Sequence, residues 1–495
     1  MKPHINDNIA FPIPAQQRPK LSGMEFYTKT LGAPKLVVAP MVDQSELAWR
    51  LLCRRHGAQL CYTPMYHSNI FIQDIKYRQQ ALQSCPEDRP LIIQFCGNDP
   101  DIILEAALLA QDHCDAIDIN LGCPQAIAKR GHYGSFLQDE WELLHNIVST
   151  LHTKLLVPVT CKIRVFDDVD KTIRYAKMLE SAGCAMLTVH GRTREQKGPL
   201  TGLADWNIIR IVRENISIPM FANGNILSME DIDRCIEATN ANGVMTAEGN
   251  LHNPCFFERV VPLTWDVASE YIDLVEQYPC PVSYIRGHLF KLFHHLMNLK
   301  TNSEIREALA VANKPNEFRD VIKTLEDKFL PFHLGDKVYS DEPCSYDTEF
   351  RTEEISFNLT LPPWLCQPYI RLEPNEHKRI QAEKFRKAID PATVKREFFD
   401  SDGNKISRKL SKKLKRLNRR PLQRTATTKR DRNLELCSID LINPVGLKCV
   451  FKLCKICCRD KCYTENIDCV GHKFLIEKRR AFKENNSKTE LPNCA

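Results

Sequence analysis

Eight short apolar segments alternate with helix-length segments between residues 36 and 247, and this alternation constrains the fold more than any other feature of the sequence. Each apolar segment has the length of a buried strand. The segments are Leu36–Pro40, Cys61–Met65, Leu91–Phe95, Ala116–Asn120, Val159–Ile163, Met186–His190, Pro219–Gly224 and Gly243–Ala247. The segments with a helical period of about 3.6 residues are Glu46–His56, Asp101–His113, Leu137–Leu151, Val169–Ala182, Trp206–Asn215 and Met229–Thr239.

Strands that alternate with helices run parallel and are joined by crossovers. Eight such units within roughly 220 residues predict an α/β fold of the closed (β/α)8 type, a TIM barrel. An open doubly wound sheet is the alternative. Such a sheet usually has a glycine-rich turn after its first strand, whereas this chain has Ala39-Pro40-Met41-Val42 there.

The composition predicts an intracellular protein of several domains. The chain has 495 residues, a net charge of +6 and 21 cysteines. Its first residues contain no long apolar core, and no apolar run reaches the length of a membrane span, so we expect neither a signal peptide nor a membrane anchor. We therefore expect a cytoplasmic location and cysteines that are reduced thiols or metal ligands rather than disulfides.

Polar side chains stand at the ends of most predicted strands. They include Gln94, Asn120, Lys162, His190 and Asn223. Barrel enzymes take their catalytic groups from the carboxyl ends of several strands, so we interpret this pattern as an active site. A lysine within an apolar strand is costly unless it has a partner. The alternative for Lys162, His190 and Gln94 is a frayed strand end exposed to water.

Cys123 lies on a Gly-Cys-Pro turn directly after the fourth predicted strand. Glycine and proline favour a sharp turn there, and catalytic groups are common on such loops. An intracellular cysteine is often no more than a small buried apolar residue, so that reading stays open for this residue taken alone.

The loops after the seventh and eighth strands predict a phosphate site. Asn223-Gly224-Asn225 follows one strand and Ala247-Glu248-Gly249-Asn250 follows the next. Barrels often bind phosphate between these two loops, where small residues let backbone N–H groups approach the oxygens. We expect a short helix to start within Asn250–Pro254. The Glu248 carboxylate would repel a phosphate unless it turns away.

Five motifs, in this order, resemble those of the flavin-dependent tRNA-dihydrouridine synthases. They are LVVAPM from Leu36, DINLGCP from Asp118, VTCKIR from Val159, LTVHGR from Leu187 and FANG from Phe221. The resemblance covers roughly residues 30 to 330. The last loop is most similar to the eukaryotic branch that modifies positions 16 and 17 of the tRNA D-loop. The common family form has Gly-Arg where this chain has Ala247-Glu248, so backbone donors become the candidates for holding phosphate.

The resemblance implies an FMN-binding barrel followed by a helical domain that grips tRNA, with NADPH as reductant and a monomeric state. It places Pro40, Met41 and Val42 along the flavin and Gln94 at the edge of its ring system. It places Lys162 and His190 at the flavin or the uracil. It assigns Cys123 as the proton donor, and the phosphate to Asn223, Gly224, Asn225, Ala247 and Glu248. It further implies substrate contacts by Asn120, Arg164, Arg192 and Arg286.

The chemistry of uracil reduction fits these residue types. A hydride must reach C6, which reduced flavin supplies, and a proton must reach C5. A free cysteine titrates near ~8.5, so it is mostly protonated at neutral pH and can donate. Lys162 and His190 would stabilise negative charge that develops on an oxygen or on the flavin. The target base must leave its stack, which is easier for a loop nucleotide than for a paired one.

A basic segment and a cysteine-rich segment follow the helical region. Within 377–432, the stretch from Lys405 to Arg420 would place Ile406, Leu410, Leu414 and Leu417 on one helical face, with basic residues around them. Such a stretch would attract the RNA backbone. A nuclear import signal and a solvated tail are the alternatives.

Cysteine pairs near the end of the chain predict a structural zinc site. Cys454, Cys457, Cys469 and His472 give the most regular spacing, and Cys449, Cys458 and Cys462 are competing ligands. A bound Zn²⁺ would allow so short a segment to fold. A tail of free thiols is the alternative.

These observations divide the chain into seven predicted parts. They are a loose N-terminal arm (1–30), the FMN-binding barrel (31–268), a helical tRNA-binding domain (269–335), a linker (336–376), the basic segment (377–433), the zinc module (434–480) and a tail (481–495). The function that we predict is reduction of tRNA uridine. A flavin oxidoreductase of free pyrimidines and an RNA-binding protein with an inactive barrel are the alternatives.

Overall fold

Eight parallel strands close into a barrel, because β1 pairs with β2 on one side and with β8 on the other. The predicted TIM barrel is therefore confirmed, and the closure excludes the open sheet. Each strand lies in or overlaps one of the eight apolar segments. The strands are β1 (Leu36–Val38), β2 (Leu60–His67), β3 (Leu91–Cys96), β4 (Ala116–Leu121), β5 (Val159–Arg164), β6 (Met186–His190), β7 (Met220–Asn223) and β8 (Gly243–Thr246).

The protein is seen here in a computed structural model that describes part of the chain. The described residues are 19–339, 361–371, 374–376, 378–379, 398–399, 405–406, 437–439, 445 and 449–472. The chain divides into two units, Met1–Lys395 and Arg396–Ala495, and each is considered by itself.

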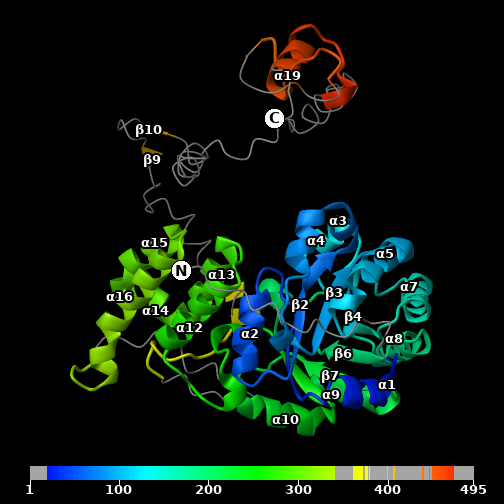
Figure 1. The fold of residues 1–495 in the computed structure, drawn as a ribbon, viewed down its shortest axis with the longest axis horizontal. Coiled ribbons are helices and arrows are strands. Elements are labelled where there is room, and N and C mark those ends of the chain that lie inside the picture. The colour runs from blue at the N-terminus through cyan, green and yellow to red at the C-terminus, as the bar shows by residue number, and fades with distance from the viewer. Residues whose placement is uncertain are drawn as a thin grey trace, which may run out of the picture. The chain divides into compact units, whose positions relative to one another are not determined.

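Helices surround the barrel where the 3.6-residue pattern predicted them. These six are α2 (Leu47–Arg55), α5 (Pro100–Ala110), α7 (Trp141–Lys154), α8 (Val169–Ser181), α9 (Trp206–Asn215) and α10 (Met229–Thr239). In Figure 1, β2, β3, β4, β6 and β7 are labelled in the first unit, with helices such as α5, α7 and α8 around them. Aspartates cap three of them: Asp99, Asp168 and Asp205 accept backbone N–H groups of the first turns of α5, α8 and α9. Shorter helices fill the other connections: α3 (Ser68–Gln73), α4 (Ile75–Ala81), α6 (Ala126–Gly131) and α11 (Glu248–His252).

The described part of the predicted loose N-terminal arm (1–30) is packed, which corrects that prediction for residues 22–30. It forms α1 (Gly23–Glu25) and a π-helical turn (Phe26–Thr30). Phe26 and Tyr27 are buried among residues from the beginnings of the strands, and the rings of Tyr27 and Phe221 lie 6.2 Å apart. These two aromatic side chains therefore help to close the amino-terminal end of the barrel. Their burial explains why an otherwise polar segment is ordered.

Five helices follow the barrel and form the predicted helical region, which begins at Thr264 rather than at residue 269. They are α12 (Thr264–Gln277), α13 (Val282–Leu292), α14 (His294–Asn298), α15 (Ser303–Val311) and α16 (Pro315–His333). A buried polar cluster joins α12 and α13 to the barrel. Glu46 accepts hydrogen bonds from the Tyr271 hydroxyl at 2.6 Å and from His288 Nε2 at 3.0 Å, and the His288 ring stacks on Trp49 at 3.9 Å.

Residues 361–371, which belong to the predicted linker, pack against the helical region. Trp364 and Cys366 are buried, and Trp364 contacts the rings of Phe329 and Phe332. Backbone hydrogen bonds join this segment to Pro262 and Thr264. Burial of the apolar side chains of this segment holds it against the helical region.

The second unit is described in pieces. Phe398–Phe399 (β9) pairs antiparallel with Lys405–Ile406 (β10), so the predicted basic helix does not include its first two residues. The rest of that helix and most of the basic segment lie outside the described residues. Further on, α19 (Lys455–Thr464) carries three of the clustered cysteines, Cys457, Cys458 and Cys462, and a 3₁₀ turn (Val470–His472) follows Cys469. Across the described residues, every helix is too short or too polar to cross a bilayer.

We expect the variant Glu46→Ala to be strongly destabilised. The change would leave His288 and the Tyr271 hydroxyl buried without their shared acceptor. Loss of one partner from a buried pair commonly costs several kcal/mol, so the free energy of unfolding should fall by roughly 3 kcal/mol. The thermal midpoint measures the effect. The control Glu307→Ala, at an exposed site on α15, should leave the midpoint unchanged, and an equal midpoint for both variants would contradict this account.

Candidate active site

Parallel register aligns the polar strand ends at the barrel mouth. Asn120 of β4 pairs with Lys162 of β5, and His190 of β6 pairs with Arg164 on one side and with Asn223 on the other. Since parallel strands all end on one side of the barrel, these residues meet there. Lys162 Nζ donates a 2.8 Å hydrogen bond to Asn223 Oδ1, so two predicted site residues on β5 and β7 are in direct contact.

A buried hydrogen-bond network lies beneath the mouth. Gln94 Nε2 donates to Asp118 Oδ2 at 2.7 Å, and the Thr160 hydroxyl donates to Asp118 Oδ1 at 2.6 Å. Gln94 Oε1 accepts from Asn120 Nδ2 at 2.9 Å. Burial raises the pKa of Asp118 to about 6, even though both hydrogen bonds act to lower it. The Gln94 side chain is thus held by the protein itself, and its predicted contact with a flavin would need its remaining donor or acceptor capacity.

The same network holds the turn that carries Cys123. Asn120 Oδ1 accepts hydrogen bonds from the backbone N–H groups of Gly122 at 3.1 Å and Cys123 at 2.9 Å. On the other side, the backbone carbonyl of Cys123 accepts from the backbone and hydroxyl of Ser135 at 3.1 and 3.0 Å. Asn120, which we predicted as a substrate ligand, therefore positions Cys123. A direct contact of Asn120 with substrate stays a prediction.

Cys123 is partly buried and its thiol is protonated at neutral pH. It packs against a cluster that includes Cys96 and Tyr133. Burial raises the pKa of the Cys123 thiol, and the nearby charges of Arg164, Lys162 and Lys197 offset this only in part. The partial exposure separates Cys123 from a purely structural cysteine, and a protonated thiol suits an acid.

Positive charge is concentrated at the mouth without an equal number of acids. Burial, aided by the charge of Arg164, lowers the pKa of Lys162 to about 8. Burial lowers the pKa of Arg164 to about 10. Burial and the positive charge of Arg164 together lower the pKa of Arg192 to about 10. Each shift means that the charged form, although still predominant at neutral pH, is less favourable here than in water. An anionic ligand would relieve the repulsion and restore these pKa values.

His190 is neutral and its tautomer can be assigned. Burial and the charges of Lys162, Arg164 and Arg192 hold its pKa well below the usual range. Its Nε2 lies 3.0 Å from Arg192 Nη1. Since a guanidinium has only donors, Nε2 must accept and the proton must lie on Nδ1. His190 is therefore equipped to donate one hydrogen bond from Nδ1 and does not add to the positive charge.

A cavity of about 350 Å³ opens beside these residues, at the ends of β5 to β8. Its lining includes the predicted residues Arg164, His190, Arg192, Asn223, Gly224, Asn225, Ala247 and Glu248. Pro124 and Gln125, which follow Cys123, line it too. The cavity thus collects most of the predicted cofactor residues and borders the Cys123 turn.

Gly224 is required where it stands. Its φ is +114°, and an added Cβ would lie 2.6 Å from Ala204 Cβ and 3.0 Å from His190 Cδ2. Beside it, Asn225 Oδ1 accepts from Arg192 Nη2 at 2.6 Å and from the backbone N–H of Ala204 at 3.1 Å. The loop after β7 therefore fixes the Arg192 guanidinium at the cavity wall.

The loop after β8 differs from the prediction in one respect. Helix α11 begins at Glu248 and ends at His252, so Asn250–Pro254 contains the end of a helix rather than its start. Asn250 is buried and accepts from Trp49 Nε1 at 3.0 Å, which turns it away from any ligand. Ala247 and Glu248 do line the cavity, as predicted.

Arg371 is a cavity residue that the sequence analysis missed. Its Nη2 and Nε lie 2.7 and 3.0 Å from the two oxygens of Glu248, which forms a bidentate ion pair. The pair turns the Glu248 carboxylate toward a guanidinium, so its charge no longer opposes an anion in the cavity. Tyr369, Ile370 and Arg371 all line the cavity. The sequence did contain one indication of such a residue, because an acidic side chain at position 248 of a phosphate loop needs a cationic partner.

Five predicted flavin residues and two predicted substrate residues are absent from the lining of this cavity: Pro40, Met41, Val42, Gln94, Lys162, Asn120 and Arg286. Pro40 and Met41 are not part of its lining, and Val42 is exposed and borders a separate cavity of about 440 Å³ near Tyr284. Arg286, on α13, donates to the backbone carbonyl of Ala312 at 2.5 Å. Contacts of Pro40, Met41 and Val42 with a flavin and of Arg286 with RNA stay predictions.

The predicted zinc ligands do not form one group, so that set is wrong as a single site. Cys469 and His472 lie with Cys449 and Cys458, whereas Cys454 and Cys457 lie with Cys437. Cys457 and Cys458 are neighbours on α19 and belong to different groups, because successive residues of a helix point in different directions.

Comparison with known proteins identifies the relatives of this chain. The family described as "Dihydrouridine synthase (Dus)" matches residues 37–330. The "tRNA-dihydrouridine(16/17) synthase [NAD(P)(+)]-like" protein of Mus musculus is 49% identical over 477 residues, which cover 94% of each chain. The "tRNA-dihydrouridine(16/17) synthase [NAD(P)(+)]" of Schizosaccharomyces pombe is 46% identical over 371 residues, 71% of this chain and 91% of the relative. The Mus musculus "tRNA-dihydrouridine(20a/20b) synthase [NAD(P)+]-like" protein is 35% identical over 312 residues, covering 61% and 90%.

We expect Cys123 to react slowly with iodoacetamide at neutral pH. Alkylation requires the thiolate, and the raised pKa of Cys123 means that its thiolate forms only above the ordinary range. The rate should therefore keep rising beyond pH 9, the ordinary pKa being 9.0. Peptide-resolved mass spectrometry measures it. The same cysteine in the urea-unfolded chain should level off at lower pH, and a native rate that is already maximal at pH 8 would contradict the prediction.

Proposed function

This chain belongs to the dihydrouridine synthase family, and from that premise we propose that it reduces the 5,6 double bond of uridine in tRNA. The proposed cofactor is FMN and the proposed reductant NADPH. The names of the relatives give NAD(P)(+) as their nucleotide and tRNA as their substrate, which supports this assignment. The single observation that carries the proposal is the group of buried cations at the barrel mouth.

The residues at the mouth are suited to FMN. FMN combines a phosphate with a ring system that becomes anionic on reduction, so it needs positive charge over an extended site. Arg164, Arg192 and Lys162 provide that charge, and all three have pKa values lowered by burial in the absence of an anion. The glycine at 224 lets its loop pack directly against Ala204 and His190 at the cavity wall. Arg371 neutralises Glu248, the one lining residue of the loop after β8 that would oppose a phosphate.

Bound FMN would supply a hydride to uracil C6, with NADPH as the source of the electrons. Of the residues present, Arg192 with the Gly224–Asn225 loop is best placed for the phosphate. Lys162 and the Nδ1–H of His190 are best placed for polar atoms of the ring system or the uracil. Their positive charge and N–H groups would stabilise charge that develops on an oxygen in the transition state.

Cys123 would deliver the proton to uracil C5. Its thiol is protonated at neutral pH because burial raises its pKa. After the transfer, the thiolate would be stabilised by Lys162, Arg164 and Lys197, whose charges already act on it. Asn120 and Ser135 would hold the turn during this step, since both bind its backbone. Solvent would return the proton to the sulfur.

The D-loop positions 16 and 17 are the proposed targets. The relatives named for positions 16 and 17 are more similar to this chain than the relative named for 20a and 20b, at 49% and 46% against 35% identity. One of them covers nearly the whole chain, including the cysteine-rich unit. The helical region of α12 to α16 and the basic segment are the proposed RNA contacts, the latter lying mostly outside the described residues.

We expect the purified protein to oxidise NADPH faster when tRNA is present. A transcript with uridine at positions 16 and 17 should gain dihydrouridine at both, because a loop base can be unstacked at modest cost. A matched transcript with cytidine at both positions is the control and should gain none. Mass spectrometry of the digested RNA measures the product. Reduction of free uridine with indifference to tRNA would favour the free-pyrimidine alternative, and a protein inert with every substrate would favour the inactive barrel.

Cys123→Ala should retain its flavin and lose at least 99% of its turnover, since general acid catalysis is typically worth about 10²–10⁴ in rate. Cys96→Ala, at a buried cysteine of the same cluster, is the matched control and should keep most of the activity. Single-turnover reduction of the tRNA measures both. A Cys123→Ala protein as fast as the control would remove Cys123 from the mechanism.

Arg192→Ala should purify with little flavin. The change removes a charge from the cavity wall and a partner from Asn225, and one charge-assisted contact is worth about 1.5–3 kcal/mol, roughly a tenfold to hundredfold loss of affinity. Flavin absorbance per protein measures it. Arg210→Ala, at an exposed site on α9, should keep its full content. A fully loaded Arg192→Ala protein would place the phosphate elsewhere.

A further inference from the structure

The cysteine-rich part of the second unit has a core made largely of sulfur. Its buried residues, among those described, are Cys437, Cys449, Leu453, Cys454, Cys458, Cys462 and Cys469. Only one of these is a conventional apolar residue, and Phe451, Cys457 and Ile467 add partial cover. Apolar burial on this scale is too small to stabilise a segment of this length, so another source of stability is needed.

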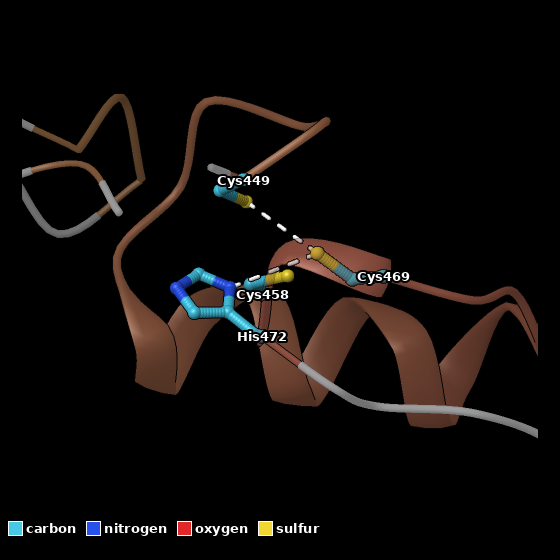
Figure 2. A group of neighbouring side chains, drawn as sticks. All are labelled: Cys449, Cys458, Cys469 and His472. Atoms are coloured by element: carbon cyan, nitrogen blue, oxygen red, sulfur yellow. Dashed lines mark hydrogen bonds between the residues drawn. The ribbon is translucent and has the colours of Figure 1, made fainter. Parts of the chain in front are cut away.

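Four side chains in this core converge on one point, as Figure 2 shows. Cys458 projects from α19, Cys449 comes from the preceding loop, and Cys469 and His472 come from the turn after the helix. The three sulfurs and one ring nitrogen of His472 all lie within 4.8 Å of one another. Cys449, Cys458 and Cys469 are buried and His472 is half-buried.

The separations match those of ligands around a tetrahedral ion. Cys449 Sγ and Cys469 Sγ are 3.9 Å apart, and Cys469 Sγ and His472 Nδ1 are 3.8 Å apart. Zinc bonds of about 2.3 Å to sulfur and about 2.0 Å to nitrogen place tetrahedral ligands roughly 3.6–3.8 Å from each other. A disulfide would require about 2.05 Å between sulfurs, so these cysteines are not oxidised partners.

The backbone at Cys449 also suits a thiolate. The N–H of Leu453 points at Cys449 Sγ at 3.5 Å. Hydrogen bonds of this kind orient a ligating sulfur and stabilise its negative charge. A charged sulfur in a buried core would be unfavourable on its own, and a divalent cation would compensate it.

We propose that Cys449, Cys458, Cys469 and His472 bind one Zn²⁺ ion, with His472 acting through Nδ1. Three sulfurs and one imidazole form a closed tetrahedral set, which is the arrangement of structural zinc sites and leaves no position open for catalysis. The three thiols would release their protons on binding. The ion would cross-link the loop before α19, the helix itself and the turn after it, and so replace the missing apolar core. This inference is independent of the proposed function.

Cys437, Cys454 and Cys457 form a separate group, and Cys462, whose sulfur lies 3.9 Å from Cys458 Sγ, belongs to neither group. The sulfurs of Cys437, Cys454 and Cys457 lie within 4.8 Å of one another, and the N–H of Cys457 points at Cys454 Sγ at 3.4 Å. The described residues offer this group no fourth member within the same distance. We make no assignment there, but the group must be kept apart from the four-ligand site in any experiment.

The test is the zinc content of the purified full-length protein, measured by elemental analysis after tag removal and dialysis against a weak chelator. His472→Ala and Cys449→Ser should each lose one equivalent. The double variant should lose the same single equivalent, because both residues hold one ion. Cys454→Ser, at a cysteine of the separate group, should leave this equivalent in place. His472→Cys should retain the ion, since zinc accepts four thiolates equally well.

A second measurement guards against variants that fail to fold. X-ray absorption at the zinc edge of the unmodified protein should show imidazole nitrogen as well as sulfur around the metal. A metal-free protein, an all-sulfur coordination shell, or additive losses from Cys449→Ser and His472→Ala would each overturn the proposal.

Discussion

The parallel register of the strands is the constraint from which the rest of the site follows. Asn120 pairs with Lys162, and His190 pairs with Arg164 and Asn223, so closure of the barrel brings these polar side chains together at the mouth. A shift of one residue in any strand would turn its side chain from the barrel interior to the surrounding helices. The same strand register is therefore needed both for packing of the barrel and for the position of the polar side chains at its mouth.

The mouth concentrates positive charge at a cost to stability. Burial lowers the pKa values of Lys162, Arg164 and Arg192, and the charge of Arg164 lowers those of Lys162 and Arg192 further. The hydrogen bonds of Arg164 to the carbonyls of Thr193 and Gln196 hold its guanidinium in place despite this repulsion. The unfavourable charge becomes useful when a ligand of opposite charge arrives. Strain of this kind is characteristic of functional sites.

Local patterns predicted the features that depend on nearby residues. The strands, the six main helices and the position of the loop glycine at 224 all followed from periodicity and strand ends. The sequence could not reveal that Arg371 reaches Glu248, because 123 positions separate them and the intervening fold decides the contact. The zinc ligands were misgrouped for a related reason. Regular spacing suggested Cys454 and Cys457, whereas the direction of each side chain on α19 selects Cys458 instead.

The aromatic residues at the amino-terminal end of the barrel determine from which side ligands can enter it. Phe26 and Tyr27 fill that end together with Phe221 and Met245, so the described residues leave the opposite mouth as the approach to the barrel axis. A dinucleotide and a nucleobase that both react with one ring system at this mouth would have to enter through the same opening. Each could then bind only after the other has dissociated. The two would exclude each other because the barrel has one accessible end, whatever their relative affinities.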